Sequence, residues 1–404
     1  MTPFHVFILS ELYLPAESGT GYLMGKLAEG LASRYQVTVV CGYPLDARVK
    51  GIPAVENQDG VIVQRCVGTK FNKDKVWLRS LNLFTISFSI FLKSFRLVQR
   101  GDKVLVVTNP PSLPFFASIV CKLRRAKCYL LIHDVYPEVL TAAGLVAAES
   151  FTARRLNRLN SWLYNRMEKI IVLGRDMRRI VARRAHAVES RIVIIPNWAD
   201  VDEIVPLQRK ENAFLAQLRI LDKFVIQYAG NMGRTHGIEN LLESAQRLRD
   251  RDDIHYLFAG EGAKRRWLEE RVRALGLGNV TILPLQPRRE LCNLLNACDV
   301  SVISFIPGMA GLSVPSRMYS IMAAGKPIIA VADDDSELAM VVREEDIGWI
   351  VPPDRPELLV EVILRSQSEP GVAQEMGKRA RRVAEQKYPF ARVLESYQNL
   401  FAIQ

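Results

Sequence analysis

Glycine-rich turns with basic neighbours are the residues of this sequence that could do chemistry. The segment QYAGNMGRTHG places Gly230 and Gly233 directly after an apolar run, and Arg234 follows them. The segment YLFAGEG repeats the same step with Gly260 and Gly262. Backbone N–H groups at such turns, together with a guanidinium group, suit a diphosphate. The two turns therefore predict an anion site at the carboxyl ends of neighbouring strands.

A third loop has a related composition. The segment PGMAGLSVPSR runs into a helical pattern, and residues 305–330 contain no aspartate or glutamate. Small residues let the backbone approach a ligand closely. We expect this loop to extend the same anion site, because it also lies at the carboxyl end of a strand of the same sheet.

The N-terminal half has two comparable positions. Gly19 and Gly21 precede a helical pattern in ESGTGYLMG, and His133 and Asp134 follow an apolar run in YLLIHDVYPE. The two glycines either present N–H groups to an anion or only form a turn. The loop before them is about ten residues long, and the strand QVTVVCG ends without an acidic residue, which argues against a nicotinamide-binding fingerprint. His133 lies where α/β proteins place catalytic groups, although a structural role is equally open.

An acidic triplet, Asp333–Asp335, could in principle hold a metal–diphosphate complex. It leads directly into the amphipathic pattern SELAMVV. Aspartate and serine are preferred residues at helix N-termini. We therefore predict helix capping here, and no metal site.

These candidate residues need a scaffold that brings strand ends together. Short β-branched runs alternate with helical segments of 10–15 residues along the whole chain. This alternation predicts parallel sheets with helices on both faces, and its length predicts two doubly wound domains. We place an N-terminal domain at 1–200 and a C-terminal domain at 201–387. If the two domains face each other, the loops at both sets of strand ends line one cleft.

The net charge of +11 over 404 residues is confined to the first half. Residues 1–200 hold 28 Lys/Arg against 15 Asp/Glu. Such asymmetry indicates a polyanionic partner: a nucleic acid, an anionic membrane or a phosphorylated substrate. The basic clusters 122–127, 154–166 and 175–186 accompany an apolar, aromatic segment at 76–95, which favours anionic lipid. No nucleic-acid-binding motif is recognisable, so we expect no nucleic acid partner.

The cellular compartment follows from cysteine usage and hydropathy. None of the six cysteines forms a Cys-x-x-Cys pair, which is typical of a reducing cytoplasm and of no structural metal. The N-terminus lacks a basic lead and a signal-like apolar run, and no window is apolar enough to span a bilayer. We expect a cytoplasmic protein that is peripheral to the inner membrane.

The ordered motifs AESGTG, HDVYPE, IPNWAD, YAGNMGRTHG, FAGEG and VPSRMYSIMAAGKP resemble those of family 4 glycosyltransferases. The resemblance covers nearly the full length. It is strongest to the bacterial colanic-acid, capsule and exopolysaccharide branch, whose fold consists of two facing domains and is called GT-B. It implies retaining transfer of a sugar from a nucleotide diphosphate sugar to a lipid-linked or polysaccharide-precursor acceptor. It implies no metal and no cofactor, and a C-terminal helix at 388–404 that returns to the N-terminal domain.

The resemblance also suggests roles for individual residues. His133 and Asp134 correspond to catalytic positions, and Gly19 and Gly21 to the acceptor and phosphate loop. The donor-binding positions are Gly230, Asn231, Gly233, Arg234, His236, Gly260, Glu261, Gly262, Gln286, Gly311, Leu312, Ser313, Ser316, Arg317 and Ser320. Many relatives carry two glutamates where this chain has Leu312 and Ser320, and an Arg and a Lys where it has Asn231 and His236. We expect Arg234 and Arg317 to replace the basic pair.

Two other functions fit the sequence. A sugar-nucleotide 2-epimerase has the same fold and uses paired carboxylates. The sequence shows no suitable pair facing the cleft, and Asp134, Glu138 and Glu261 are the carboxylates left open. A catalytically inactive nucleotide-binding scaffold would explain the missing glutamates. The sugar, the acceptor and the choice between UDP and GDP are not encoded in any motif that we recognise.

Overall fold

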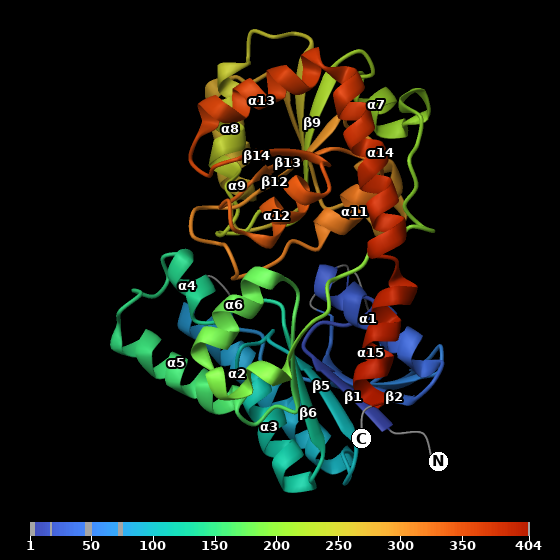
Figure 1. The fold of residues 1–404 in the computed structure, drawn as a ribbon, viewed down its shortest axis with the longest axis vertical. Helices are drawn as coiled ribbons and strands as arrows, with labels where there is room; N and C mark the ends of the chain where they lie inside the picture. The colour runs from blue at the N-terminus through green and yellow to red at the C-terminus, as the bar shows by residue number, and fades with distance from the viewer. Residues whose placement is uncertain (1–4, 17, 45–50, 72–75, 403–404) are drawn as a thin grey trace. The chain divides into compact units, whose positions relative to one another are not determined.

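The computed structural model describes residues 5–16, 18–44, 51–71 and 76–402, which fall into two compact units (Figure 1). The N-terminal unit comprises Met1–Glu138, Val146–Pro196 and Leu394–Gln404. The C-terminal unit comprises Val139–Leu145 and Asn197–Val393. The sequence placed the domain break after residue 200 and the return of the chain at 388, whereas the units change at Asn197 and at Leu394.

The N-terminal unit is built on an eight-stranded sheet with the order β3-β4-β2-β1-β5-β6-β7-β8. Neighbouring strands are parallel except for β3 and β4. The chain winds outward in both directions from β1, so the order reverses between β1 and β5, which is where such sheets bind ligands. The strands are β1 (His5–Ser10), β2 (Gln36–Gly42), β3 (Val55–Gln58), β4 (Val61–Cys66), β5 (Lys103–Val107), β6 (Lys127–Ile132), β7 (Lys169–Val172) and β8 (Ile192–Ile194).

The hairpin formed by β3 and β4 was not predicted, and the expectation of purely parallel strands was wrong at this edge. Asp59 and Gly60 connect the two strands with positive φ angles of 50° and 83°. An Asp-Gly pair with this geometry is a strong hairpin signal. A search for strands alternating with helices passes over it because no helix separates the two strands.

The C-terminal unit contains a six-stranded, fully parallel sheet with the order β11-β10-β9-β12-β13-β14. Its order reverses between β9 and β12, next to the loops that carry most of the predicted donor site. The strands are β9 (Phe224–Ala229), β10 (Ile254–Ala259), β11 (Val280–Leu283), β12 (Val300–Ser304), β13 (Ile328–Val331) and β14 (Gly348–Val351).

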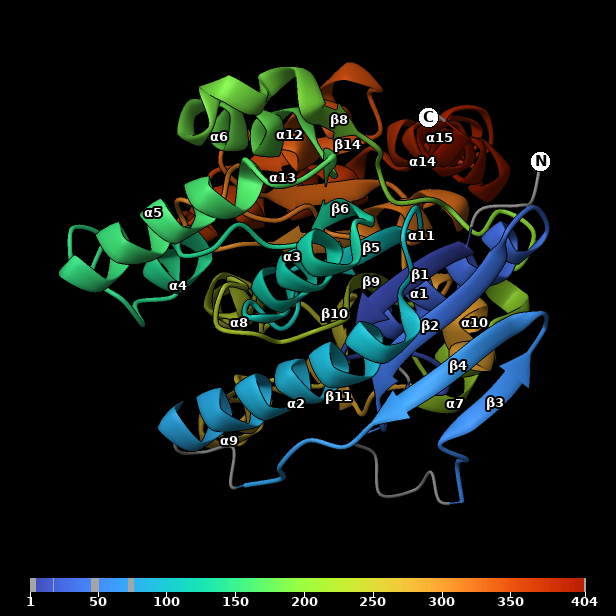
Figure 2. The same ribbon diagram turned by 90° about the horizontal axis from the view of Figure 1, so that it is seen from below.

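Helices cover the sheet of each unit. In the N-terminal unit, α2 and α3 lie side by side (Figure 2). The end of α15 packs on this unit through Phe401, whose ring contacts those of Tyr35 and Tyr129. The helices that belong wholly or mainly to this unit are α1 (Gly19–Ala32), α2 (Val76–Leu97), α3 (Leu113–Arg124), α5 (Phe151–Tyr164), α6 (Arg175–Arg184), the 3₁₀ helix η1 (His186–Arg191) and α15 (Phe390–Ala402). The last two residues of the predicted C-terminal helix lie outside the described range.

The helix α4 (Glu138–Ala142) begins with the last residue of one segment of the N-terminal unit, and its remaining residues belong to the C-terminal unit. None of the described helices is both long and apolar enough to cross a membrane. The helices of the C-terminal unit are α7 (Ala213–Leu218), α8 (Ile238–Arg247), α9 (Arg265–Leu275), α10 (Leu291–Leu295), α11 (Arg317–Ala323), α12 (Glu337–Glu344), α13 (Pro356–Ser368) and α14 (Pro370–Lys387), with the 3₁₀ helices η2 (Arg209–Glu211) and η3 (Arg288–Glu290).

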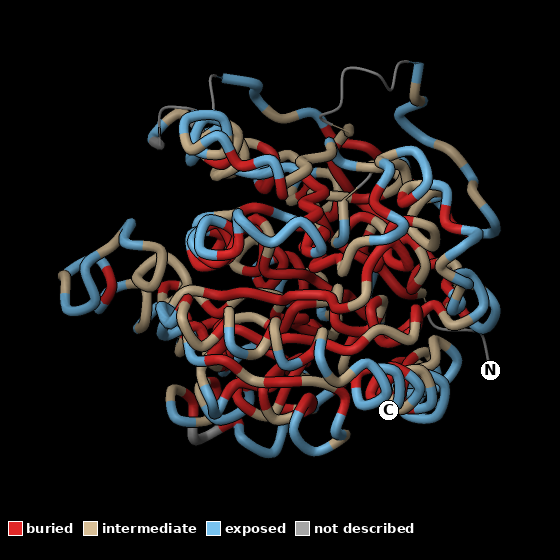
Figure 3. Tube along the Cα trace, turned by 90° about the horizontal axis from the view of Figure 1, so that it is seen from above, coloured by how far each residue is buried: buried red, intermediate tan, exposed pale blue. Residues whose placement is uncertain are grey.

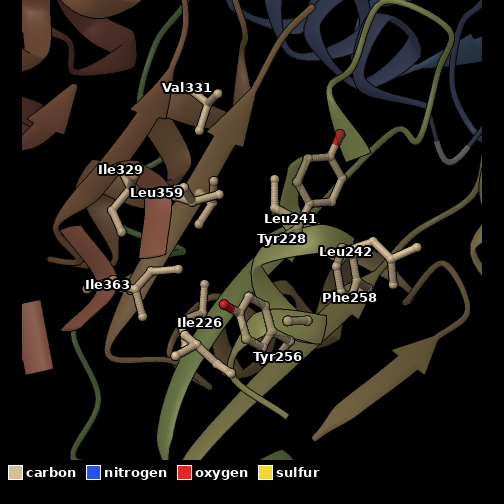
Figure 4. Close-up of a cluster of buried hydrophobic side chains, with 14 of the residues drawn as sticks. Ile226, Tyr228, Leu241, Leu242, Tyr256, Phe258, Ile329, Val331, Leu359 and Ile363 are labelled. Atoms are coloured by element: carbon tan, nitrogen blue, oxygen red, sulfur yellow. The ribbon is translucent and has the colours of Figure 1, made fainter. Parts of the chain in front are cut away.

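The central strands of both sheets are buried on their two faces, as is typical of parallel sheets covered by helices (Figure 3). All residues of β5 and β10 are buried. In the C-terminal unit, Tyr228 and Phe258 pack with Leu241 of α8, and Ile329 packs with Leu359 of α13 (Figure 4). This core fixes the ends of β9 and β10, from which the glycine loops extend.

Candidate functional site

The two glycine loops of the C-terminal unit pack directly on each other. The N–H of Gly230 donates to the carbonyl of Ala259 (2.8 Å), and the N–H of Met232 donates to the carbonyl of Glu261 (2.7 Å). Gly230, Gly260 and Gly262 have φ angles of +140°, +144° and +149°, which side chains rarely adopt. A Cβ atom on Gly262 would lie 2.5 Å from the Met232 backbone. Glycine is therefore required here by the close approach of the loops.

This packing changes the role expected for two backbone amides. The N–H groups of Gly230 and Gly260 donate to the carbonyls of Ala259 and Leu283, so these two are used within the protein. Gly233 is different, because its N–H makes no backbone hydrogen bond within the described residues. A Cβ atom on Gly233 would meet the Asn231 amide at 3.0 Å and the His236 ring at 3.1 Å. The tip of the first loop, around Gly233, is the part with a donor left for an anion.

Arg317 is held against the first loop. Its guanidinium carbon lies 4.4 Å from the centre of the Tyr228 ring, and its Nη1 donates to the carbonyl of Ala229 (3.4 Å). A Cβ atom on Gly230 would lie 3.1 Å from the same nitrogen, so only glycine leaves room for the guanidinium here. Arg317 is the first residue of α11, which has only seven residues. Its guanidinium group is held in place by stacking on Tyr228 and by the hydrogen bond to the Ala229 carbonyl. The short helix does not fix its position.

Tyr228 organises this region, and it was not predicted. Besides carrying Arg317, its hydroxyl donates to the carbonyl of Asn231 (2.6 Å) within the first loop. Tyrosine at the end of a buried strand reads as a core residue in the sequence. Its role in holding Arg317 and the first loop depends on contacts between segments, which a local sequence pattern does not contain.

His236 packs between aromatic rings and lies beside two cations. Its ring centre is 5.3 Å from that of Phe305 and 6.5 Å from that of Tyr228. Burial, followed by the positive charges of Arg317 and Lys264, holds the pKa of His236 well below its usual 6.5. His236 is therefore neutral at physiological pH, and it does not replace a basic residue.

Lys264 supplies a cation that the sequence prediction missed. Its ammonium group donates to the carbonyl of His236 (2.7 Å) and to the carboxylate of Glu239 (2.8 Å). Its own N–H donates to the carbonyl of Met232 (2.9 Å), which ties the second loop to the first. The run GAKRR directly after the second glycine turn was the available signal.

Two other predicted residues make local bonds. The carboxylate of Glu261 pairs with Arg265 (3.0 Å), whose guanidinium also binds the carbonyls of Gly260 and Leu283. Gln286 follows β11 and donates to the carbonyl of Pro284 (2.9 Å). Glu261 therefore braces the second loop, and Gln286 lies at the same edge of the sheet beside it.

The third loop is anchored by an aspartate. The carboxylate of Asp333, which follows β13, accepts from the N–H groups of Gly308 (3.2 Å) and Ala310 (3.0 Å). The predicted helix cap is confirmed at Ser336, whose hydroxyl accepts from the N–H of Ala339 (3.2 Å). Asp333 is thus a loop anchor, and the serine that follows the acidic triplet is the residue that caps α12.

The loop that Asp333 anchors leads to the remaining predicted donor positions. Leu312 is only 5% exposed, so its apolar side chain belongs to the core. Ser313, Ser316 and Ser320 are half-buried, and Gly311 is buried. Neither Leu312 nor Ser320 offers a carboxylate, and this unit must hold a ligand through other groups.

If the chain uses the nucleotide-sugar donor that the sequence resemblance implies, Asp333→Ala is expected to lower kcat/KM for that donor about tenfold, because two charge-assisted hydrogen bonds that order the third loop are lost. Steady-state kinetics with varied donor would measure the change. Asp333→Asn should give a kcat/KM between those of the parent and Asp333→Ala, because the amide retains one acceptor oxygen. Asp334→Ala is the matched control, since its ion pair with Arg343 is exposed and such pairs contribute little. Equal kinetics for Asp333→Ala and Asp334→Ala would exclude the anchoring role.

The N-terminal unit gathers its predicted residues at adjacent strand ends. Ser18 caps α1 by accepting from the N–H of Gly21 (3.1 Å), so this glycine packs inside the cap. The N–H groups of His133 and Asp134 donate to the hydroxyl of Thr108 (3.0 and 3.3 Å). Since β1, β5 and β6 are successive in the sheet, Gly19, Thr108 and His133 lie along one edge.

His133 is held as a neutral ring. Its Nε2 atom is buried and has no hydrogen-bond partner within the described residues. Burial lowers the pKa of His133 to about 4. An uncharged imidazole with an unsatisfied nitrogen can bind a hydroxyl group of a ligand, whereas a cationic acid is not available above pH 5.

Comparison with known proteins gives consistent matches along the chain. Residues 18–203 match the family described as Glycosyltransferase Family 4, and residues 210–383 match Glycosyl transferases group 1. A relative from Pseudomonas aeruginosa, "Probable glycosyltransferase WbjE", is 33% identical over 368 residues, covering 89% of this chain and 88% of its own. "Putative colanic acid biosynthesis glycosyl transferase WcaI" from Escherichia coli K12 is 25% identical over 368 residues, covering 86% and 88%. The fold is similar to that of HepE from Anabaena, solved with UDP and glucose (TM-score 0.78, 14% identity, 99% and 100% covered).

Proposed function

The chain belongs to glycosyltransferase family 4, in its bacterial polysaccharide-biosynthesis branch and with the GT-B fold, and we propose that it uses a UDP- or GDP-sugar as donor. The observation that carries the proposal is the stacking of Arg317 on Tyr228 beside the paired glycine loops. A guanidinium fixed in this way can bind phosphate oxygens with little loss of conformational freedom. Lys264 and the N–H of Gly233 lie at the same loops and complement it.

The reaction that we propose is retaining hexosyl transfer without a metal or a cofactor. Arg317 and Lys264 would stabilise the negative charge that develops on the leaving diphosphate, which is the task a metal has in other transferases. The leaving phosphate oxygen would accept the proton of the acceptor hydroxyl on the same face of the sugar. Neutral His133 would bind a sugar hydroxyl, and Asp134, the next residue, would be the second catalytic residue.

Two carboxylates required by the epimerase alternative are already paired. Glu261 binds Arg265, and Glu138 forms an ion pair with Arg184 in the N-terminal unit. Neither is poised as a free acid or base. The remaining candidate, Asp134, has no second carboxylate among these residues to work with. We therefore favour transfer over epimerisation.

A thermal-shift screen of UDP-, GDP- and ADP-sugars tests the donor proposal. A true donor at about 100 times its Kd should stabilise the protein by about 2.7 kcal/mol, seen as a rise of several degrees in Tm. The sugar identified is then incubated in EDTA, with and without membrane lipid extract as acceptor, and the anomeric configuration of the product is read by NMR. Inversion would exclude retention, loss of activity in EDTA would exclude metal independence, and epimer formation without acceptor would support the alternative.

For the acceptor, we propose a lipid-linked or polysaccharide-precursor molecule at the cytoplasmic face of the inner membrane. The excess of Lys and Arg in residues 1–200 supports an anionic membrane surface as partner, and no nucleic acid is proposed. The N-terminal unit would hold the acceptor near Gly19 and Gly21.

A further inference from the structure

Helix α2 carries apolar side chains on both of its faces. Its inner face is buried through residues such as Ile86 and Ile90 (6% and 0% exposed). Its outer face is apolar as well, and its residues follow helical spacing: Trp77, Leu81, Phe84, Phe88 and Leu92 are 65%, 38%, 52%, 43% and 44% exposed. A surface helix normally places polar residues on its solvent side, so the outer face of α2 needs an apolar partner.

The exposed face continues onto α3 through a cluster of aromatic rings. Phe116 of α3 lies 5.6 Å from Phe84, 6.0 Å from Phe88 and 5.5 Å from Phe91, measured between ring centres. Leu123 extends the surface along α3 and is 60% exposed. We call the exposed set Trp77, Leu81, Phe84, Phe88, Leu92 and Leu123 the α2–α3 ridge. The ring contacts hold the ridge in place as a preformed surface.

Positive charge accompanies the ridge, and negative charge does not. The sequences of α2, α3 and α5 contain no aspartate or glutamate. Phe116, early in α3, packs on Phe84 of α2, and Arg124, at the end of α3, stacks over Phe95 near the end of α2 (4.3 Å to the ring centre). Later residues of α3 therefore meet later residues of α2, so the two helices run in the same direction. Their basic ends, with Arg96 on α2 and Lys122 on α3, therefore lie together at one end of the ridge. This combination is complementary to anionic lipid headgroups above acyl chains.

We propose that the α2–α3 ridge inserts into the acyl-chain boundary of an anionic bilayer, with α2 lying in the plane of the membrane. From Trp77 to Leu92 the helix rises about 22 Å, which is enough for five apolar side chains to enter one leaflet together. In a doubly wound unit, helices begin at the edge of the sheet where the strands end. The Trp77 end of α2 is therefore on the side of the N-terminal unit that carries Gly19 and His133. The inference rests on the proposed lipid-linked acceptor, because insertion would bring that edge to the membrane surface.

Vesicle sedimentation of the full chain tests the insertion. We expect binding to phosphatidylcholine vesicles that contain phosphatidylglycerol, and weaker binding without phosphatidylglycerol. Phe84→Ser combined with Phe88→Ser should lower the partition coefficient about tenfold or more, since two exposed aromatic side chains no longer leave water. The matched control is Val372→Ser, an exposed apolar residue of α14 that should bind as the parent does. Equal binding by the double variant and the parent would overturn the proposal.

Quenching by lipids with brominated acyl chains distinguishes insertion from headgroup attraction. Trp77 should be quenched in anionic vesicles, and Trp77→Phe should remove most of the quenching. Quenching that is unaffected by Trp77→Phe would overturn the proposal. So would sedimentation equilibrium showing a dimer that the double variant converts to monomer, because the ridge would then be an interface between two copies of the chain.

Donor binding is measured on the same variants in the absence of lipid. The double variant should keep the full thermal shift with the donor sugar, because its substitutions lie outside the C-terminal unit. Vesicle binding without any donor shift would leave the ridge standing and remove the proposed function. A donor shift without vesicle binding would overturn the proposal for the ridge and leave the proposed function standing.

Discussion

Arg317→Ala is expected to lower kcat/KM for the sugar donor by about ten- to a hundredfold. A charge-assisted hydrogen bond to phosphate contributes roughly 1.5–3 kcal/mol, and each 1.4 kcal/mol corresponds to a factor of ten. Arg317 should matter more than an average surface arginine because Tyr228 and the Ala229 carbonyl fix its position before the donor arrives. If the contact strengthens as charge develops on the leaving group, kcat falls along with the rise in KM.

The controls separate charge from geometry. Arg317→Lys retains the charge but loses the planar group that stacks on Tyr228, so it should recover only part of the activity. Arg266→Ala removes an arginine that is 90% exposed on α9 in the same unit, and it should behave as the parent does. Steady-state kinetics at varied donor concentration measure all three. Parental kinetics for Arg317→Ala would remove this residue from the donor site.

The positions of the glycine loops could be read from the sequence because they rest on local rules. Apolar runs followed by Gly230 and Gly260 indicate strands ending in turns, and parallel strands place such ends on one edge. The same rules located the cap of α12. The hairpin at Asp59 and Gly60 obeys an equally local rule, and it was missed only because the search assumed a helix between strands.

What the sequence could not show is how side chains from distant segments meet. Tyr228 and Arg317 are 89 residues apart, and their stacking depends on the order of strands in the sheet. The neutral state of His236 depends on burial and on two cations from other segments. The sequence around Asp333 predicts a helix cap, and only the fold shows that its carboxylate accepts a hydrogen bond from the N–H of Gly308. Such roles follow from tertiary contacts, and spacing alone does not contain them.

The packing explains in part why this chain has no glutamate at Leu312, one of the two positions where the family resemblance leads us to expect an acidic residue. Leu312 is buried, and a glutamate there would need a partner to offset its desolvation. With Arg317 and Lys264 already at the loops, the unit has cations for a diphosphate without that carboxylate. We predict that contacts to the sugar and the ribose of the proposed donor come from hydroxyl or backbone groups of the third loop.

Gly260→Ala is expected to be a severely damaging single-methyl change in the C-terminal unit. The new Cβ atom would overlap the carbonyl oxygen of Gly230, and the φ angle of +144° is unfavourable for alanine. Backbone strain of this kind costs about 1–3 kcal/mol, and forced separation of packed groups costs about as much again. We expect Tm to fall by roughly 5–15 °C and the donor-induced thermal shift to disappear, since the loops that hold Arg317 and Lys264 must move apart.

Gly276→Ala provides the matched control for that change. Gly276 ends α9 with a φ angle of +63°, and a Cβ atom there would have no neighbour within 4 Å. It therefore carries a backbone penalty of about 1 kcal/mol without the steric overlap, and the donor shift should survive. Calorimetry of both variants with and without the donor sugar measures the difference. If the two variants lose the same stability and both still bind the donor, then the contact between the glycine loops is not what requires Gly260. If Gly260→Ala alone loses binding, the close approach of the loops is itself part of the site, because it sets where Arg317 can meet a phosphate.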